Sequence, residues 1–213
     1  MNAPTPAGLA GILARNKGAT PASSWTPAPG SILFTYVDNS NIWIEGQRIQ
    51  AVKSGLARDL TDAARRGVCV PWSYDFGRLY EMVCPKGTSI GRSILVGSKP
   101  PPNDSLWERA RDEGFEVEVF DRNRSNKEKQ VDSTIVTKML DDSYRHMKAE
   151  RGDTAVLVAG DADYMPCVRS LQERNLKIRV VFWKHATSHE LRDSVDNFTP
   201  LDPYFDQLTL SPT

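Results

Sequence analysis

Two aspartates, Asp161 and Asp163, stand one residue apart directly after the apolar run TAVLVAG (154–160). Asp38 likewise follows the apolar run SILFTYV (31–37). Continuous apolar and β-branched runs are typical of strands buried on both faces of a sheet, so each run would place its acid at the carboxyl end of a strand. Like charges at the end of a buried element raise one another's pKa values unless a helix end, a proton or a cation compensates them.

A fourth acid, Asp132, opens a helix that the pattern predicts over 131–150. At about 100° per residue it shares a side of that helix with Met139 of the apolar stripe, so we expect it to face the sheet. Asp141 points to the opposite side and is expected at the surface. Asp142 also lies well off the apolar stripe.

The elements that must position these acids alternate between strands and helices. Strands separated by segments of helix length predict βαβ units, and therefore an α/β fold with a mainly parallel sheet and helices on both faces. The predicted strands are 31–37, 89–98, 115–120, 154–160 and 176–183, and the predicted helices are 48–67, 75–84, 104–114, 131–150, one from Tyr164, and 188–195, before a last segment at 198–205. We expect a disordered N-terminal tail over 1–30, one domain over 31–206 and a short C-terminal tail over 207–213.

In an open α/β sheet, ligands bind at the carboxyl ends of the strands, near the point where the strand order reverses. With the order 3-2-1-4-5, the strands that carry Asp38 and Asp161 are neighbours at that point. Each acid alone has a simpler explanation: a turn residue for Asp38, a helix-start acid for Asp132, and a helix cap for Asp163. Together, four carboxylates without His or Cys favour a hard cation, Mg²⁺ or Mn²⁺, and hence phosphodiester hydrolysis.

Composition limits the partners that the chain can have. Lys and Arg number 27, as do Asp and Glu, so the net charge is about zero and a phosphate-rich partner would need a local basic patch. No stretch approaches the roughly 18 apolar residues of a membrane span, so no membrane association is expected. The three cysteines form no C-x-x-C pair and the three histidines complete no zinc-ligand spacing, which favours reduced thiols in a cytoplasmic protein.

Three stretches of the chain resemble, in this order, the motifs of a known family: YVDNSNIW (36–43), KEKQVDS (127–133) and VLVAGDADYMPCV (156–168). The segment SHELRDSVDNFTPL (188–201) is similar to that family's terminal pattern of a serine, a leucine, an acid and an aromatic residue. On these residues the chain resembles the NYN-domain family of PIN-like nucleases, over nearly all of 31–202.

The resemblance implies a PIN-like sheet of order 3-2-1-4-5 and RNA cleavage that depends on Mg²⁺ or Mn²⁺. It implies that the metal and catalytic acids are Asp38, Asp132, Asp161 and Asp163. Asn41 would hold the first turn or contact a phosphate. Ser188 and Asp196 match terminal positions beside the site, although docking of the last segment explains Asp196 equally well.

The chain departs from the family pattern at three positions. Relatives often carry small hydroxyl residues where Ala159 and Ala162 stand, and many carry a further acid where Lys138 stands. Lys138 lies about 120° from Asp132 on the helical wheel, so we do not expect it to enter the site. The four acids are unaffected, but metal affinity or rate would be altered.

A nucleic-acid substrate also needs cations near the acids. The loop that precedes Asp132 supplies Arg122, Arg124, Lys127 and Lys129, and further rim candidates are Arg48, Lys53, Lys99 and Lys184. Trp43 is a candidate for stacking on a base. The simpler alternatives are a solvated charged loop, and a tryptophan packed under the following helix.

A metal-dependent endoribonuclease is the function that the sequence favours, with an RNA-binding or assembly adapter of the same fold as the alternative. A phosphohydrolase of the haloacid-dehalogenase type would need a second Asp two residues after Asp38, where Ser40 stands. Cleavage of DNA stays open because a contact to the 2′-OH cannot be read from the sequence. Dimerisation is common among PIN-like domains, so a homodimer is a further expectation.

Overall fold

The computed structural model describes residues 25–98, 105–120 and 127–210 of the chain. Most of the predicted N-terminal tail and part of the charged loop at 121–130 lie outside these ranges, so both stay predictions. Within the described ranges, no helix is long and apolar enough to cross a membrane.

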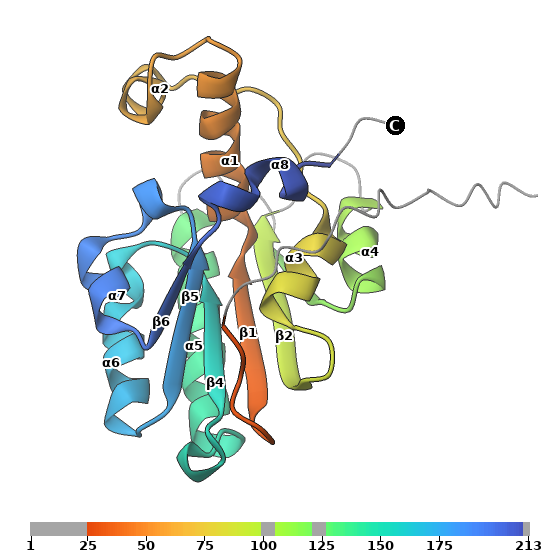
Figure 1. Ribbon diagram of the computed structural model, residues 1–213, viewed down its shortest axis with the longest axis vertical. Coiled ribbons are helices and arrows are strands. Elements are labelled where there is room, and N and C mark those ends of the chain that lie inside the picture. Colours follow the sequence, from red (N-terminus) through yellow and green to blue (C-terminus); the bar gives the residue numbers. More distant parts are fainter. Residues whose placement is uncertain (1–24, 99–104, 121–126, 211–213) are drawn as a thin grey trace, which may run out of the picture.

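The sheet is parallel throughout and has the strand order β3-β2-β1-β4-β5-β6 (Figure 1). The predicted α/β fold and the order 3-2-1-4-5 are therefore confirmed. A sixth strand lies beside β5; it was not predicted, because it has only four residues and ends in a proline. The strands are β1 Ile32–Asp38, β2 Ser89–Ser98, β3 Glu116–Phe120, β4 Thr154–Val158, β5 Lys177–Phe182 and β6 Asn197–Pro200.

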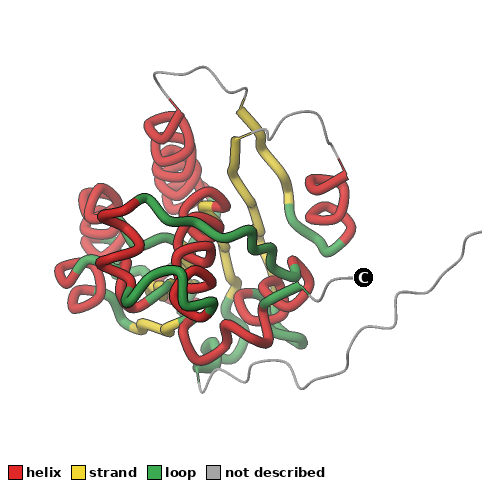
Figure 2. The backbone as a smooth tube through the Cα atoms, turned by 90° about the horizontal axis from the view of Figure 1, so that it is seen from above, coloured by secondary structure: helices red, strands yellow, loops and turns green. Residues whose placement is uncertain are grey.

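Helices cover both faces of this sheet, as Figure 2 shows from above. The helix α5 lies behind the sheet in Figure 1, where it contacts β1, β2, β3 and α6, and α3 lies in front. The α-helices are α1 Asn39–Lys53, α2 Leu60–Arg66, α3 Phe76–Val83, α4 Ser105–Asp112, α5 Lys127–Arg145, α6 Met165–Glu173, α7 His189–Ser194 and α8 Phe205–Leu208. Short 3₁₀ turns are η1 Ala149–Arg151, η2 Ala162–Tyr164, η3 Lys184–Ala186 and η4 Asp202–Tyr204.

The central strands are apolar because both of their faces are buried. All five residues of β4 are buried, as are six of the seven residues of β1. By contrast, β3 pairs only with β2 and carries its glutamates at the edge of the sheet. The register aligns Val37 of β1 with Val158 of β4, so the two strands end together at the carboxyl edge.

Two predicted helix boundaries are wrong. The helix predicted over 48–67 is interrupted: α1 ends at Lys53, Gly55 has a positive φ of 72°, and Asp59 caps a separate helix, α2. The helix predicted over 131–150 begins earlier and ends earlier, at Lys127 and Arg145. Asp132 therefore lies in the second turn of α5, beyond the first-turn positions at which a helix-start acid gains most from the macrodipole.

Asp142, which lies off the apolar stripe of α5, is nevertheless buried. Its side chain is only 1% exposed and accepts hydrogen bonds from the Tyr36 hydroxyl, at 2.8 Å, and from Arg92, at 2.6 Å. The apolar stripe of α5 could not indicate this position, because a polar residue is buried here only through partners on β1 and β2. Asp141 lies at the surface as expected, paired with Arg145.

Candidate active site

Asp38 ends β1 and at the same time begins α1. Its carboxylate accepts the backbone N–H of Asn41 at 3.0 Å, which makes it the N-cap of the helix. The residue is only 3% exposed. The predicted turn role is thus a helix cap in the structure, and capping leaves the second carboxylate oxygen, Oδ2, directed at other groups.

Asn41 joins two of the acids. Its side-chain nitrogen donates to Oδ2 of Asp38 at 3.2 Å and to Oδ2 of Asp161 at 2.6 Å. The acids come from β1 and from the turn after β4, the two strands between which the order reverses. The amide hydrogens partly offset the repulsion between the two carboxylates.

Tyr164 joins Asp38 to the third acid. Its buried hydroxyl lies 3.3 Å from Oδ2 of Asp38 and donates to Oδ1 of Asp132 at 2.9 Å. Burial, followed by the charges of Asp38 and Asp132, raises the pKa of the tyrosine well above its usual range, so the hydroxyl keeps its proton. Asp132 faces the sheet side of α5 as expected, although sequence reasoning did not identify Tyr164 as part of the site.

Asp38 is a buried acid whose negative charge needs compensation. Its burial raises the pKa of the carboxyl group to about 7, the hydrogen bonds from Asn41 oppose that rise, and the nearby charges of Asp132 and Asp161 add to it. A buried carboxylate beside two others is unfavourable in its charged form without a cation.

Asp163 reaches the same cavity from an exposed position. The simpler explanation for Asp163, a side-chain cap on the following helix, is not what the structure shows, because neither η2 nor α6 has a side-chain cap hydrogen bond. The carboxylate of Asp163 instead lines the cavity that Asp38, Asp132 and Asp161 also line.

This cavity has a volume of about 380 Å³ and lies over the reversal point of the sheet. Its α1 wall carries Glu45 and Arg48, which form an ion pair. Glu45 also accepts from His185 at 3.0 Å, and His185 lies 3.6 Å from Asp202. Burial opposes protonation of His185, but its bonds to Asp202 and Glu45 outweigh that and raise its pKa to about 9. The remaining lining residues are Ser40, Asn41, Ile44, Ser98 and Val131.

The donor chemistry of the cavity fits a hard divalent cation, since four carboxylates and an amide supply only oxygen ligands. Within the described ranges, no three acid, imidazole or thiol side chains are already close enough to hold one ion. The Asn41 amide and the Tyr164 hydroxyl place hydrogens between the carboxylates instead.

Comparison with known proteins identifies the family of the chain. The NYN domain matches residues 39–202, which is most of the chain. The chain belongs to the NYN domain family. This membership implies a PIN-like nuclease.

One solved structure supports the fold of this NYN domain. The crystal structure of VPA0982, a protein of unknown function from Vibrio parahaemolyticus RIMD 2210633, is similar with a TM-score of 0.60 at 17% sequence identity. The match covers 87% of this chain and 100% of that chain. No curated protein sequence matches the chain.

Several residues predicted for the nucleic-acid interface have other neighbours in the NYN domain. Trp43 is 39% exposed and its indole N–H donates to the carbonyl of Trp72 at 2.7 Å, so one edge of the ring is anchored. Lys53 pairs with Asp206, and Lys184 is exposed. Arg122, Arg124 and Lys99 lie outside the described residues, as do the side chains of Lys127 and Lys129.

The two terminal candidates lie at different edges of the sheet. Ser188 caps α7 through Leu191, and its N–H donates to the carbonyl of Gly160, so it supports the turn that carries Asp161. Asp196 pairs with Lys177 and accepts from the N–H of Ile178, at the start of β5. Asp196 therefore docks the last segment and does not join the four acids at the carboxyl edge.

The departures from the family pattern leave the site accessible. Lys138 pairs with Glu118 of β3 at 3.3 Å, away from the cavity lining. Ala159 is buried under the turn, and Ala162 is exposed beside the acids.

Proposed function

We propose that this NYN domain is an Mg²⁺- or Mn²⁺-dependent endoribonuclease that hydrolyses phosphodiester bonds of RNA in the carboxylate cavity. The observation that carries the proposal is the linked set of Asp38, Asp132 and Asp161. Two hydrogen-bonding bridges, through Asn41 and Tyr164, join these acids at the reversal point of the sheet. Asp163 faces the same cavity.

Asp38 and Asp161 are the central ligands in this proposal, and Asp132 and Asp163 flank them. When bound, the divalent ion supplies positive charge against the phosphate and lowers the pKa of water. Asn41 orients the two central carboxylates, while Tyr164 holds Asp132 against Asp38 with a proton that burial retains. Arg48 on the cavity wall offers a cation to a phosphate next to the cleaved bond.

The choice of RNA as substrate follows from the resemblance of the three motifs, because a nuclease family alone leaves RNA and DNA open. Cleavage of end-labelled single-stranded RNA in Mn²⁺, in Mg²⁺ and in EDTA tests the proposal, with matched single-stranded DNA beside it. We expect cutting of RNA that needs the metal and falls by more than about 100-fold in Asp161→Asn, since that change removes a charged ligand.

Equal cutting by the wild-type protein and Asp161→Asn would identify a contaminating nuclease. Binding of RNA with no cutting in either metal would contradict the proposal and favour the adapter. Faster cutting of DNA than of RNA would correct the substrate but leave the site in place.

A further inference from the structure

The end of α1 and the helix α2 form an arm that projects beyond the carboxyl edge of the sheet (Figure 1). We define the arm as residues 49–70. It has a small hydrophobic cluster of its own, formed by Ala51, Ala57 and Ala63, which is separate from the main core. The arm is therefore held together by its own contacts.

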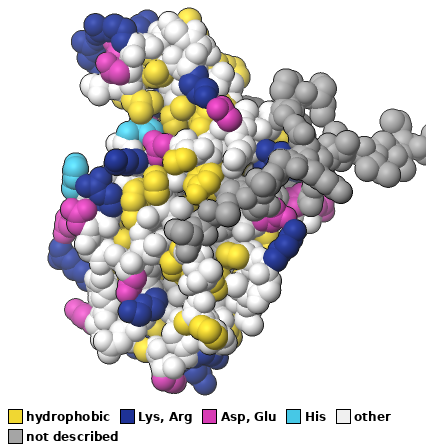
Figure 3. Space-filling view, viewed as in Figure 1, with side chains coloured by type: hydrophobic (Ala, Val, Ile, Leu, Met, Phe, Trp, Pro, Cys, Tyr) yellow, Lys and Arg dark blue, Asp and Glu magenta, His cyan; other side chains and the backbone are white. Residues whose placement is uncertain are grey.

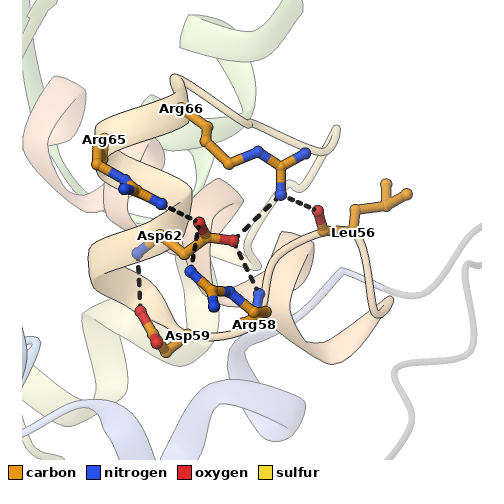
Figure 4. Close-up of polar contacts among 6 residues, drawn as sticks. All are labelled: Leu56, Arg58, Asp59, Asp62, Arg65 and Arg66. Carbon is orange, nitrogen blue, oxygen red and sulfur yellow. Dashed lines mark hydrogen bonds and ion pairs between the residues drawn. The ribbon is translucent and has the colours of Figure 1, made fainter.

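The arm is organised around one buried carboxylate, Asp62 (Figure 4). Asp62 accepts the N–H of Arg58 at 3.1 Å and the guanidinium groups of Arg65 and Arg66 at 2.9 and 3.1 Å. Arg66 also donates to the carbonyl of Leu56 at 3.1 Å. These bonds, with the Arg58 N–H first, lower the pKa of Asp62, so the carboxylate stays charged and holds the arginines in place.

The three arginines remain exposed while the carboxylate does not. The side chains of Arg58, Arg65 and Arg66 are 78%, 68% and 51% exposed, whereas that of Asp62 is 4% exposed. Figure 3 shows Lys and Arg side chains gathered over this end of the molecule. A guanidinium has five N–H donors in a planar fork that matches phosphate oxygens, and one or two bonds to Asp62 leave the others directed outward.

The helix α1 connects the cavity to the arm. Asn41, Glu45 and Arg48 lie on one face of α1 and line the cavity. The helix has 15 residues, or about 22 Å of length, so the arginines of the arm lie roughly 20 Å from the acids. A nucleic-acid strand held in the cavity and running along α1 would reach them.

We propose that Arg58, Arg65 and Arg66 bind the phosphate backbone of the RNA on one side of the cleaved bond. This inference rests on the proposed function, because it assumes that RNA enters the cavity. The local excess of exposed positive charge, on a chain whose net charge is about zero, is complementary to a polyphosphate strand. Such contacts position the strand and carry no sequence information.

The test measures equilibrium binding of a 20-nucleotide RNA and of a tetranucleotide to full-length Asp161→Asn protein, which separates binding from cutting. The arm variant is Arg58→Gln with Arg66→Gln, so that Asp62 keeps Arg65 and the Arg58 N–H. We expect the affinity for the long RNA to fall about tenfold, and the slope of log affinity against log salt to fall by about 1.4, or 0.7 for each phosphate contact. The advantage of the long RNA over the tetranucleotide should shrink.

Two further variants separate charge from folding. Arg109→Gln with Arg111→Gln removes the same charge from the last turn of α4, at the opposite edge of the sheet, and should leave the affinity unchanged. Arg58→Lys with Arg66→Lys keeps the charge and should retain most of the affinity. Equal weakening by the Gln and Lys pairs would mean that the positive charge of the arm does not carry the affinity, and would overturn the proposal.

Unchanged affinity and salt slope in the Gln pair would overturn the arm proposal while leaving the nuclease intact. Arm-dependent RNA binding by a wild-type protein that does not cut would instead refute the proposed function alone. Absence of RNA binding by the wild-type protein would overturn both.

Discussion

At the residue scale, the site is a set of carboxylates held together by hydrogen-bond donors. Asn41 and Tyr164 partly offset the repulsion between the acids, because the Asn41 amide donates to Asp38 and Asp161 and the Tyr164 hydroxyl donates to Asp132 while lying beside Asp38. Tyr164 matters most for Asp132, which comes from a different layer of the fold. Without the phenol, the helix α5 would present that carboxylate beside Asp38 with one donor fewer.

Tyr164→Phe should therefore weaken the metal site without removing a ligand. We expect the Mn²⁺ concentration that gives half-maximal cutting to rise about tenfold or more, because a hydrogen bond to a charged group is worth about 1.5–3 kcal/mol. Titration of the cutting rate with Mn²⁺ measures this directly.

Tyr36→Phe is the matched control, since it removes another buried hydroxyl that donates to a carboxylate of α5, Asp142. It should lower stability by a similar amount but leave the Mn²⁺ dependence unchanged. The same shift in both variants would show that Tyr164 acts only through stability.

At the element scale, the cavity wall depends on how the chain after β5 is attached to α1. His185, in the 3₁₀ turn η3, bonds Glu45 of α1 and lies beside Asp202 at the start of η4. Three segments that are far apart in the sequence thus meet at one imidazole, whose side chain is 21% exposed. This attachment also fixes Glu45, the partner of Arg48.

The stability of the protein should fall at alkaline pH because of this imidazole. The pKa of His185 is raised from 6.5 to about 9 in the folded protein, so its contribution is fully present below pH 6.5 and is lost as the pH rises through 9. The loss is at most on the order of 3 kcal/mol. Urea denaturation in EDTA at pH 6, 7.5 and 9.5 should show a flatter dependence in His185→Gln.

His189→Gln, which changes an exposed histidine of α7, should keep the wild-type pH dependence. If His185→Gln lost stability equally at all three pH values, packing rather than charge would explain the contribution of His185.

At the scale of the whole molecule, the site lies at the carboxyl ends of β1 and β4, where the strand order reverses. The strands β2 and β3 follow on the far side of β1, and β5 and β6 follow on the far side of β4. The strands that lead to Asp38 and Asp161, β1 and β4, lie in the middle of the sheet and belong to the main hydrophobic core. Cation binding at this position should therefore stabilise the whole domain. The homodimer stays a prediction that sedimentation can check.

Mn²⁺ should raise the thermal midpoint of the wild-type protein. At about 100 times the dissociation constant, a ligand that binds only the folded state adds about 2.7 kcal/mol, which corresponds to roughly 5–10 °C for a domain of this size. A thermal melt with and without Mn²⁺ measures the shift.

Asp161→Asn should lose most of this shift, while Asp196→Asn, at the other edge of the sheet, should keep it. A midpoint that Mn²⁺ leaves unchanged in the wild-type protein would contradict a metal site in the folded domain.

Much of this arrangement could be predicted from the sequence because the governing forces are local or periodic. Apolar runs predict buried parallel strands, and Asp38 and Asp161 follow such runs, so their position at the carboxyl edge needs no tertiary information. Helix boundaries were less predictable: the break between α1 and α2 depends on a positive φ at Gly55 and a cap at Asp59, which leave only a weak signal within a helical pattern.

The amino-acid sequence by itself determined the fold class and that Asp38 and Asp161 leave the sheet at one edge, and its resemblance to the NYN-domain family supplied the order of the first five strands. Only the tertiary structure decided three further features. It places the hydroxyl of Tyr164 between two acids, buries Asp142, and puts Asp196 at the start of β5, at the edge of the sheet opposite to the four acids. The physical reason is the distance along the chain over which the two kinds of interaction act. Strand and helix patterns arise from neighbours along the chain, whereas a buried polar group is stable only when partners from distant segments meet it.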